Sequence, residues 1–140
     1  MTTMVEATDT VCAVFKAAWD PTAYDVDWPN VRRPGPALYD GQEPWARVSV
    51  DINDAEQRTM GQTGARRFTR QGNITVQVFV PAGERGLEEA RLLCMVALNA
   101  FEGISLDGVR FVRVKPKDVG PDGPWYQVNV SADFEFDEVK

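Results

Sequence analysis

The first chemical feature of this chain is an absence, because its 140 residues include no histidine. A Ser-His-Asp triad and a Cys-His nucleophile pair both need an imidazole base, so neither can be built here. An imidazole metal ligand is excluded for the same reason. Enzymes that work with carboxylates alone stay open.

Carboxylates gather near the C-terminal end, where Asp133, Glu135 and Asp137 alternate with Phe134 and Phe136. In a strand, this alternation puts the acids on the face opposite the aromatic core residues. There they meet solvent or a neighbouring subunit, rather than an apolar pocket that would raise their pKa values. We therefore expect no catalytic residue among them.

Metal and thiol chemistry have few candidates. Asp25 and Asp27 form an Asp-x-Asp pair, which leaves a divalent cation between subunits open because carboxylates are oxygen ligands of hard cations. Otherwise we expect no cofactor and no metal site. Cys12 and Cys94 fall in apolar helical patterns without CxxC spacing, so we predict buried core thiols.

The basic residues are mostly arginines, in a chain with 15 basic and 21 acidic residues and a net charge of -6. This charge disfavours nonspecific binding to duplex DNA. The planar guanidinium binds carboxylates through paired hydrogen bonds, and arginine is common at protein interfaces. The arginines that we predict to contact acidic partners are Arg47, Arg66, Arg67 and Arg70.

Hydrophobic periodicity predicts the elements that must hold these side chains. The expected elements are helices at 3–19 and 86–101, strands at 45–52, 66–80, 108–115 and 125–136, and a short strand near 26–28. The main order, α-β-β-α-β-β, makes an α+β fold. We expect a mainly antiparallel sheet of four or more strands, packed on one face by two helices.

Alternation also predicts which strand residues point away from the helices. Trp45 on the first long strand and Trp125 on the last are expected to face outward. Arg110 and Arg113 are expected on opposite faces of the third strand, because they are three positions apart, an odd offset. Gly72 suggests a bulge or a bend in the second strand.

The connecting segments complete a single domain that covers residues 1–140. Five prolines make residues 20–44 an extended connection rather than a long helix. The polar residues 53–65 are expected to form a mobile loop between strands, and 115–124 a turn-rich loop. No stretch approaches the ~20 apolar residues that cross a bilayer, so no membrane association is expected.

The centre of the chain resembles a known family. Residues 67–86 read Arg-Phe-Thr-Arg-Gln-Gly-Asn-Ile-Thr-Val-Gln-Val-Phe-Val-Pro-Ala-Gly-Glu-Arg-Gly, and a helix with Ala90, Leu93, Ala97 and Phe101 follows. A basic-aromatic stretch with a glycine, alternating valines, a Pro-Gly turn and an Ala/Leu helix ending in Phe thus follow one another. This succession resembles the tail terminator (tail completion) proteins of long-tailed bacteriophages and gene transfer agents.

The resemblance implies a structural virion protein without enzymatic activity. Such a subunit forms a homohexameric ring that caps the tail tube, ends its growth and forms part of the head-tail joining interface. The implied partners are other copies of the chain, the tail tube protein and the head-tail connector or stopper protein. DNA passes through the lumen without specific binding. The implied location is the neck end of the virion tail, after assembly in the host cytoplasm.

Within that reading, the loop 53–65 and the arginines beside it contact neighbouring subunits or the tube. The acidic residues predicted to complement them are Asp133, Glu135 and Asp137. Two alternatives stay open. One is another neck or tail-tube component, such as a head-completion or tube subunit, and the other is a small ligand-binding or carboxylate-enzyme domain.

Overall fold

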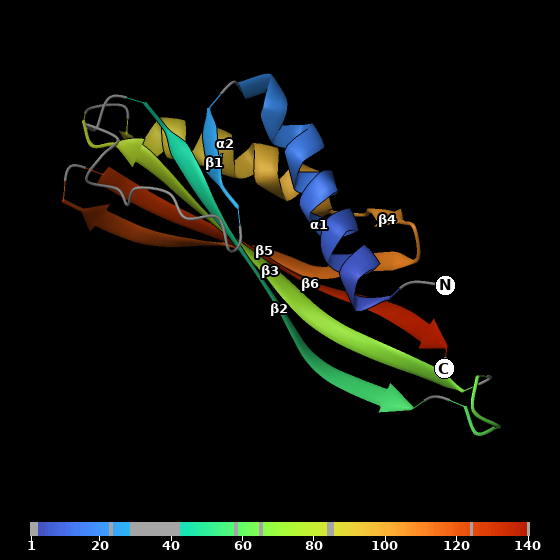
Figure 1. Ribbon diagram of the computed structural model, residues 1–140. Coiled ribbons are helices and arrows are strands. Elements are labelled where there is room, and N and C mark those ends of the chain that lie inside the picture. The colour runs from blue at the N-terminus through green and yellow to red at the C-terminus, as the bar shows by residue number, and fades with distance from the viewer. Residues whose placement is uncertain are drawn as a thin grey trace.

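A six-stranded mixed sheet carries two helices on one face in the computed structural model (Figure 1). The structure describes residues 3–22, 24–28, 43–57, 59–64, 66–83, 86–123 and 125–139. Its helices are α1 (Met4–Trp19) and α2 (Gly86–Phe101), with a short 3-10 turn, η1 (Asp20–Thr22), after α1. Its strands are β1 (Asp25–Asp27), β2 (Trp45–Gln57), β3 (Arg67–Pro81), β4 (Ser105–Leu106), β5 (Val109–Asp122) and β6 (Trp125–Val139).

The strands lie in the order β1-β2-β3-β6-β5-β4. β1 runs parallel to β2, and the other neighbouring strands pair antiparallel. The predicted α+β class, the mainly antiparallel sheet and the packing by two helices are confirmed.

Each helix forms where the sequence provides a start and an apolar stripe. The Thr3 hydroxyl accepts a hydrogen bond from the backbone N–H of Glu6 at 3.2 Å, which caps α1 as the spacing of these residues predicts. α2 begins at Gly86, with Glu88 and Glu89 in the first turn, where they suit the helix dipole. Leu87, in the first turn of α2, is exposed.

The core lies between the helices and one face of the sheet. β3 and β6 contribute alternate aliphatic and aromatic side chains to it, as period-2 alternation predicts. A chain of ring contacts joins the layers: Phe15 to Phe101 at 6.1 Å, Phe101 to Phe111 at 5.1 Å, and Phe111 to Phe134 at 6.2 Å between centroids. Each such pair stabilises by about 0.5–1.5 kcal/mol beyond area burial.

Two predicted loops are largely strand. β2 continues to Gln57, so the first part of the expected mobile loop 53–65 pairs with β3. β5 continues to Asp122, through most of the expected loop 115–124. The long partners β3 and β6 offer hydrogen bonds that outweigh the polar and turn-forming composition. Pro116 is tolerated because β5 has no partner on its other side there among the described strands.

The outward face is not polar throughout. Trp45 and Trp125, both predicted to face outward, are buried together with Phe79. The rings of Trp45 and Phe79 are stacked with centroids 4.3 Å apart, and Trp125 meets Trp45 edge-on at 6.1 Å. Most of the expected proline-rich connection, at residues 29–42, lies outside the described residues.

Gly72 lies in β3, which pairs with β6 without any shift in register. The prediction of a bulge in β3 is therefore wrong. The irregularity is on the neighbouring strand, between Ile52 and Asp54. Gly72 serves a close approach instead. A Cβ at this position would lie 2.4 Å from the carbonyl oxygen of Asp51 and 2.7 Å from the ring of Phe134.

We therefore predict that Gly72→Ala lowers the free energy of unfolding by about 1–3 kcal/mol, because backbone and a buried ring must both move. Gly83→Ala is the matched control, since no atom lies within 4 Å of its added Cβ. Urea unfolding of the two variants and the wild type measures the difference. Equal losses in both variants would contradict the close-approach explanation.

Candidate functional site

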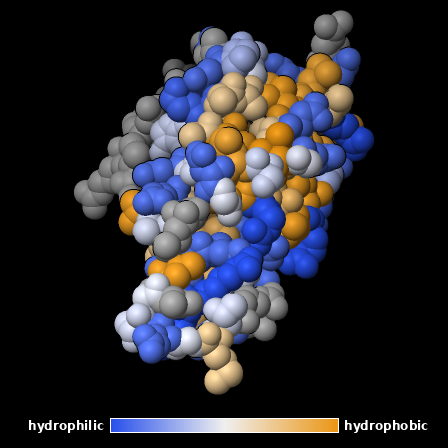
Figure 2. All heavy atoms as spheres, turned by 90° about the vertical axis from the view of Figure 1, so that its right-hand side faces the viewer, coloured by the Kyte–Doolittle hydropathy of each residue, from blue (hydrophilic) through white to orange (hydrophobic). Residues whose placement is uncertain are grey.

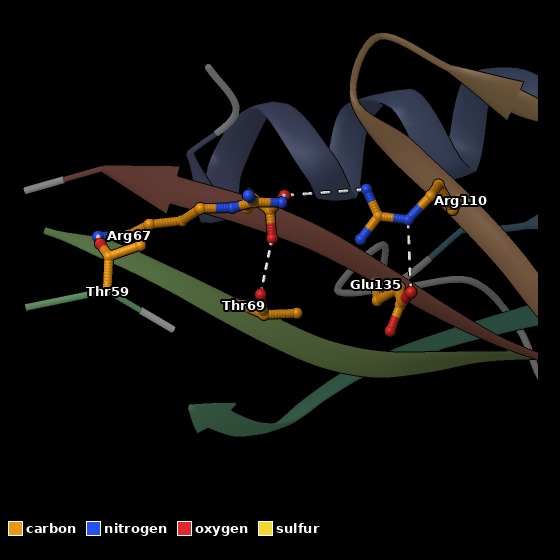
Figure 3. A network of polar contacts seen from close by, with 6 residues as sticks. Thr59, Arg67, Thr69, Arg110 and Glu135 are labelled. Carbon is orange, nitrogen blue, oxygen red and sulfur yellow. Dashed lines mark hydrogen bonds and ion pairs between the residues drawn. The ribbon is translucent and has the colours of Figure 1, made fainter. Parts of the chain in front are cut away.

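The largest group of polar contacts lies on the sheet face away from the helices, near the ends of β3, β5 and β6 (Figure 3). We call it the outer-face network. Its members are Arg67, Thr69, Arg110, Arg113, Asp133, Glu135 and Asp137. All of the acidic residues predicted as interface partners belong to it, and so does Arg67.

Asp137 is the centre of the network. Thr69 Oγ1 donates a hydrogen bond to its Oδ1 at 2.7 Å, and the Arg67 guanidinium binds its Oδ2. Arg110 Nη1 lies 3.8 Å from the same Oδ2, and Arg110 Nε donates to Glu135 Oε1 at 3.2 Å (Figure 3). One arginine therefore bridges two carboxylates of the same strand.

Strand register explains these contacts. Thr69 stands directly opposite Asp137 across β3 and β6, and Arg110 stands opposite Glu135 across β5 and β6. Directly opposed side chains on one face of a sheet are close enough to interact. The network thus follows from the positions of these residues along three neighbouring strands.

Arg113 joins the network through a bulge, which corrects the prediction that it faces away from Arg110. The register of β5 shifts between Val112 and Lys115, and Arg113 has a positive φ of 49°. This conformation is uncommon outside glycine and marks a local distortion of the strand. Arg113 Nε consequently donates to Asp133 Oδ2 at 2.7 Å, on the same face as Arg110.

The environment changes the acidity of Asp137. Burial alone would raise the pKa of this carboxyl. Hydrogen bonds from Thr69 and Arg67, together with the charges of Arg67 and Arg110, outweigh burial and hold the pKa below its ordinary value. A carboxylate with a lowered pKa is a weak base at neutral pH, so Asp137 is suited to hold arginines rather than to accept a proton from a substrate.

Arg66, Arg67 and Arg70, which are close in the sequence, have different surroundings in the structure. Arg70 lies on the helix-side face, because it stands one position from Thr69 in a regular strand. Its Nε donates to Glu138 Oε2 at 2.8 Å, and both side chains are less than one-fifth exposed. Arg66 precedes β3, where its guanidinium lies 6.0 Å from the ring of Phe68. The prediction placed these arginines in one cluster.

Arg47 occupies a different part of the outward face. Its guanidinium carbon lies 5.3 Å from the Trp45 ring centroid and 5.9 Å from that of Phe79. This geometry is a cation–π contact, which is favourable by roughly 0.5–1 kcal/mol at exposed sites. Arg47 and the aromatic cluster therefore form a unit separate from the outer-face network.

Beside the network lies an open hollow of about 680 Å³. The residues that line it are Glu6, Asp9, Thr10, Asp107, Gly108, Arg110 and Asp137. Figure 2 views the molecule from the right of Figure 1 and shows hydrophilic residues over much of the lower half, with apolar residues gathered at the upper right. In the part of the chain that the structure describes, no group of three or more metal-ligating side chains is placed to hold an ion.

The predicted cation pair and thiols can be placed in part. Asp27 is buried, so it is not an exposed loop carboxylate, and the side chain of Asp25 lies outside the described residues. Cys94 is buried as predicted, and Cys12 is half-buried. Burial, reinforced by Asp9 for Cys12 and by Asp118 for Cys94, raises the pKa of both thiols. Raised pKa values make both poor nucleophiles at neutral pH.

Sequence reasoning missed the open edge of β5. Lys115, Pro116 and Lys117 follow one another on this strand. Lysine and proline are residues that natural edge strands use against unwanted pairing. That signal could have identified residues 115–117 as an edge strand rather than a loop.

We predict that Asp137→Asn lowers the free energy of unfolding by about 1–2 kcal/mol at pH 7, because charge-assisted bonds are lost. The pKa of Asp137 is lowered on folding, so its stabilisation is full above the unfolded value of about 4 and disappears as pH falls through the folded value. Urea unfolding between pH 7 and pH 3 should show the wild type and the variant converging at acid pH.

The control for this prediction is Asp20→Asn, which removes the exposed Lys16–Asp20 ion pair. It should change stability by at most about 0.5 kcal/mol. A difference between Asp137→Asn and the wild type that persisted unchanged at pH 3 would contradict the electrostatic role of Asp137.

Comparisons with known proteins identify the fold alone. No protein-family model matches the chain, and no curated protein matches it. Among the solved chains that resemble it, one known only by a sequence identifier has a TM-score of 0.54 at 18% sequence identity, covering 91% of this chain and 94% of its own. No helix in the described part of the chain is long and apolar enough to span a membrane. The α+β sheet with two helices is thus an arrangement that a distant solved protein shares.

Proposed function

We propose that this chain is a structural subunit of the tail terminator (tail completion) type. In this proposal it forms a closed homohexameric ring on the end of a phage-type tail tube, ends tube growth and contributes to head-tail joining. It acts without enzymatic activity or a cofactor. Its partners are other copies of itself, the tail tube protein and the head-tail connector or stopper protein. Its place is the neck end of a virion tail, assembled in the host cytoplasm.

The proposal is supported by the position in the fold of the residues that resemble the tail terminator family. Residues 67–81 form β3, which stands between β2 and β6, and residues 86–101 form α2, which packs on the same sheet. The resemblance is therefore carried by the central strand and by a core helix, whose residues decide the fold. Fold alone does not specify function, so the sequence resemblance and not the solved neighbour supports the proposal.

The shape of the β2–β3 hairpin supports a role in contact between subunits. The two strands run to a tip that lies away from both helices (Figure 1). The described tip residues 59–64 are exposed, and the side chain of Met60 is 95% exposed. A projecting hairpin with an exposed methionine can reach a neighbouring ring subunit or the tube, because methionine adapts to varied apolar surfaces.

The charge of the chain also suits a conduit. With a net charge of -6 the surface repels phosphates, and low affinity for DNA is what a passage for DNA requires. The paired arginines of the outer-face network do not add to a basic patch, because each meets a carboxylate of the same chain.

The alternative reading is another neck or tail-tube component. The same hairpin and network would serve such a subunit equally well. The mode of assembly separates the two, because a tube subunit polymerises into long tubes whereas a terminator closes into a ring. The remaining alternative is a ligand-binding or carboxylate-enzyme domain. It is the least favoured of the three, because the hollow beside Asp137 is open and the arginines around this carboxylate lower its pKa.

We predict that the purified protein forms closed rings of about six subunits, seen by native mass spectrometry and negative-stain imaging with and without Mg²⁺. Added to tail tubes, it should cap their ends and stop elongation. Long polymers without added tube protein would instead favour a tube subunit. A chain that neither closes into rings nor binds tube ends would contradict the proposal.

The hairpin tip gives a second test. Met60→Asp should reduce capping of tube ends at least about tenfold, because it puts a charge where an apolar contact is proposed. Val5→Asp is the matched control, since this residue is 70% exposed on the first turn of α1. Thermal unfolding should be unchanged in both variants. Capping that is equally impaired in the two variants would remove the tip from the contact.

A further inference from the structure

Both edges of the sheet are short of partners. β1 covers only Trp45–Arg47 of β2, and β4 covers only Val109–Arg110 of β5. Among the described strands, none pairs with the remainder of β2 or with the remainder of β5 on its outer side. Backbone N–H and C=O groups along an unpaired edge are a template for another strand.

The two open edges carry opposite charges on the outward face. On β5, Lys115 and Lys117 stand opposite Ser131 and Asn129, and both lysines are exposed. Among the described residues neither lysine makes an ion pair or a hydrogen bond through its side chain. The β5 edge therefore presents uncompensated positive charge.

β2 has the opposite sign. Asp51 is exposed and stands opposite Asn73, on the outward face. Beyond the bulge after Ile52 the β2 backbone stays in register with β3, with position 54 opposite Gln71 and position 56 opposite Thr69. Among the described side chains, Asp51 thus gives the outward face of the open β2 edge a negative charge.

The helix-side face of the β2 edge is apolar, and that of the β5 edge is apolar apart from the Arg91–Asp118 ion pair. Val50 and Ile52 of β2 are half-buried against the core. Beside β5 a hollow of about 350 Å³ separates the strand from α2. The residues that line this hollow are Arg91, Cys94, Met95, Leu98, Pro116 and Asp118. Apolar side chains can therefore meet on one face while opposite charges meet on the other.

Strand direction decides how copies combine. β2 runs antiparallel to β3, β3 to β6 and β6 to β5, so β2 and β5 of one chain are antiparallel. In a ring whose axis runs along the strands, rotation about that axis brings the β2 of one copy beside the β5 of the next in that same antiparallel relation. A contact between two different surfaces of this kind repeats head to tail, and it closes into a ring when the rotation from one copy to the next closes.

We propose that neighbouring copies of this chain join by antiparallel pairing of the open β2 edge of one copy with the open β5 edge of the next. Pairing of like edges is disfavoured because it brings like charges together. The shifts after Val112 and after Asp118 confine regular pairing to a short stretch of β5. This inference rests on the proposed ring and names the surfaces that form it.

Two variants of opposite charge test the pairing. Ser49→Lys with Asp51→Lys makes the β2 edge basic, and Lys115→Glu with Lys117→Glu makes the β5 edge acidic. Alone, each variant presents like charges at the contact, so the protein concentration for half-assembly should rise at least about tenfold. Mixed in equal amounts, the basic β2 edge of one variant meets the acidic β5 edge of the other. Alternating rings should then form at the wild-type concentration.

The matched control is Asn99→Lys with Glu102→Lys, which adds the same positive charge as the β2 variant on exposed positions at the end of α2. It should assemble like the wild type. Sedimentation velocity and native mass spectrometry measure ring formation, and the mass difference between the two variants identifies alternating rings. Circular dichroism verifies that every variant is folded.

The outcomes separate the edge pairing from the proposed function. Rings formed equally well by the wild type and by each charge variant alone would overturn the edge pairing and leave the ring-forming function intact. Variants that fail alone and also fail when mixed would overturn the pairing as well. A wild-type chain that stays monomeric at high concentration would overturn the pairing, and failure to bind tube ends in addition would overturn the proposed function.

Discussion

The pairing of β3 with β6 is the constraint on which the rest of the structure depends. Each residue from Arg67 to Pro81 stands opposite a residue between Val139 and Trp125, with no shift in register. The shifts occur in the flanking strands β2 and β5 instead. Because the central pair is regular, alternation holds along its whole length, and one row of side chains faces the helices while the other faces away.

This division gives each face a different kind of interaction. The helix-side row packs against α1 and α2, where small residues such as Ala90 and Ala97 let α2 lie close to the sheet. The outward row places Thr69 opposite Asp137 and so builds the centre of the charged network. The surface ion pairs there contribute little stability individually. Their main physical effect is to fix the charged groups of three strands relative to one another.

The fold class, both helices and the core rows of β3 and β6 could be predicted, because periodicity and capping are local properties of the sequence. The extent of β2 and β5 could not, since pairing with a long neighbour overrides a polar or proline-containing sequence. The face of Arg113 depends on a bulge that alternation does not foresee. The acids of the candidate site were found from the sequence, but their partners Arg110 and Thr69 required the register.

The arginines and the lysines of β3 and β5 make different contacts, and the difference follows from the chemistry of the two side chains. Arginine provides a planar fork, and Arg67, Arg110 and Arg113 each use it on a carboxylate of β6. Lysine is a flexible, strongly hydrated charge, and Lys115 and Lys117 stand exposed on the open edge of β5. These three arginines thus contribute to the shape of the subunit, while Lys115 and Lys117 leave a charge for something outside it. Because lysine also discourages unselective edge pairing, an edge that bears it favours a partner strand whose acidic side chains compensate the charge.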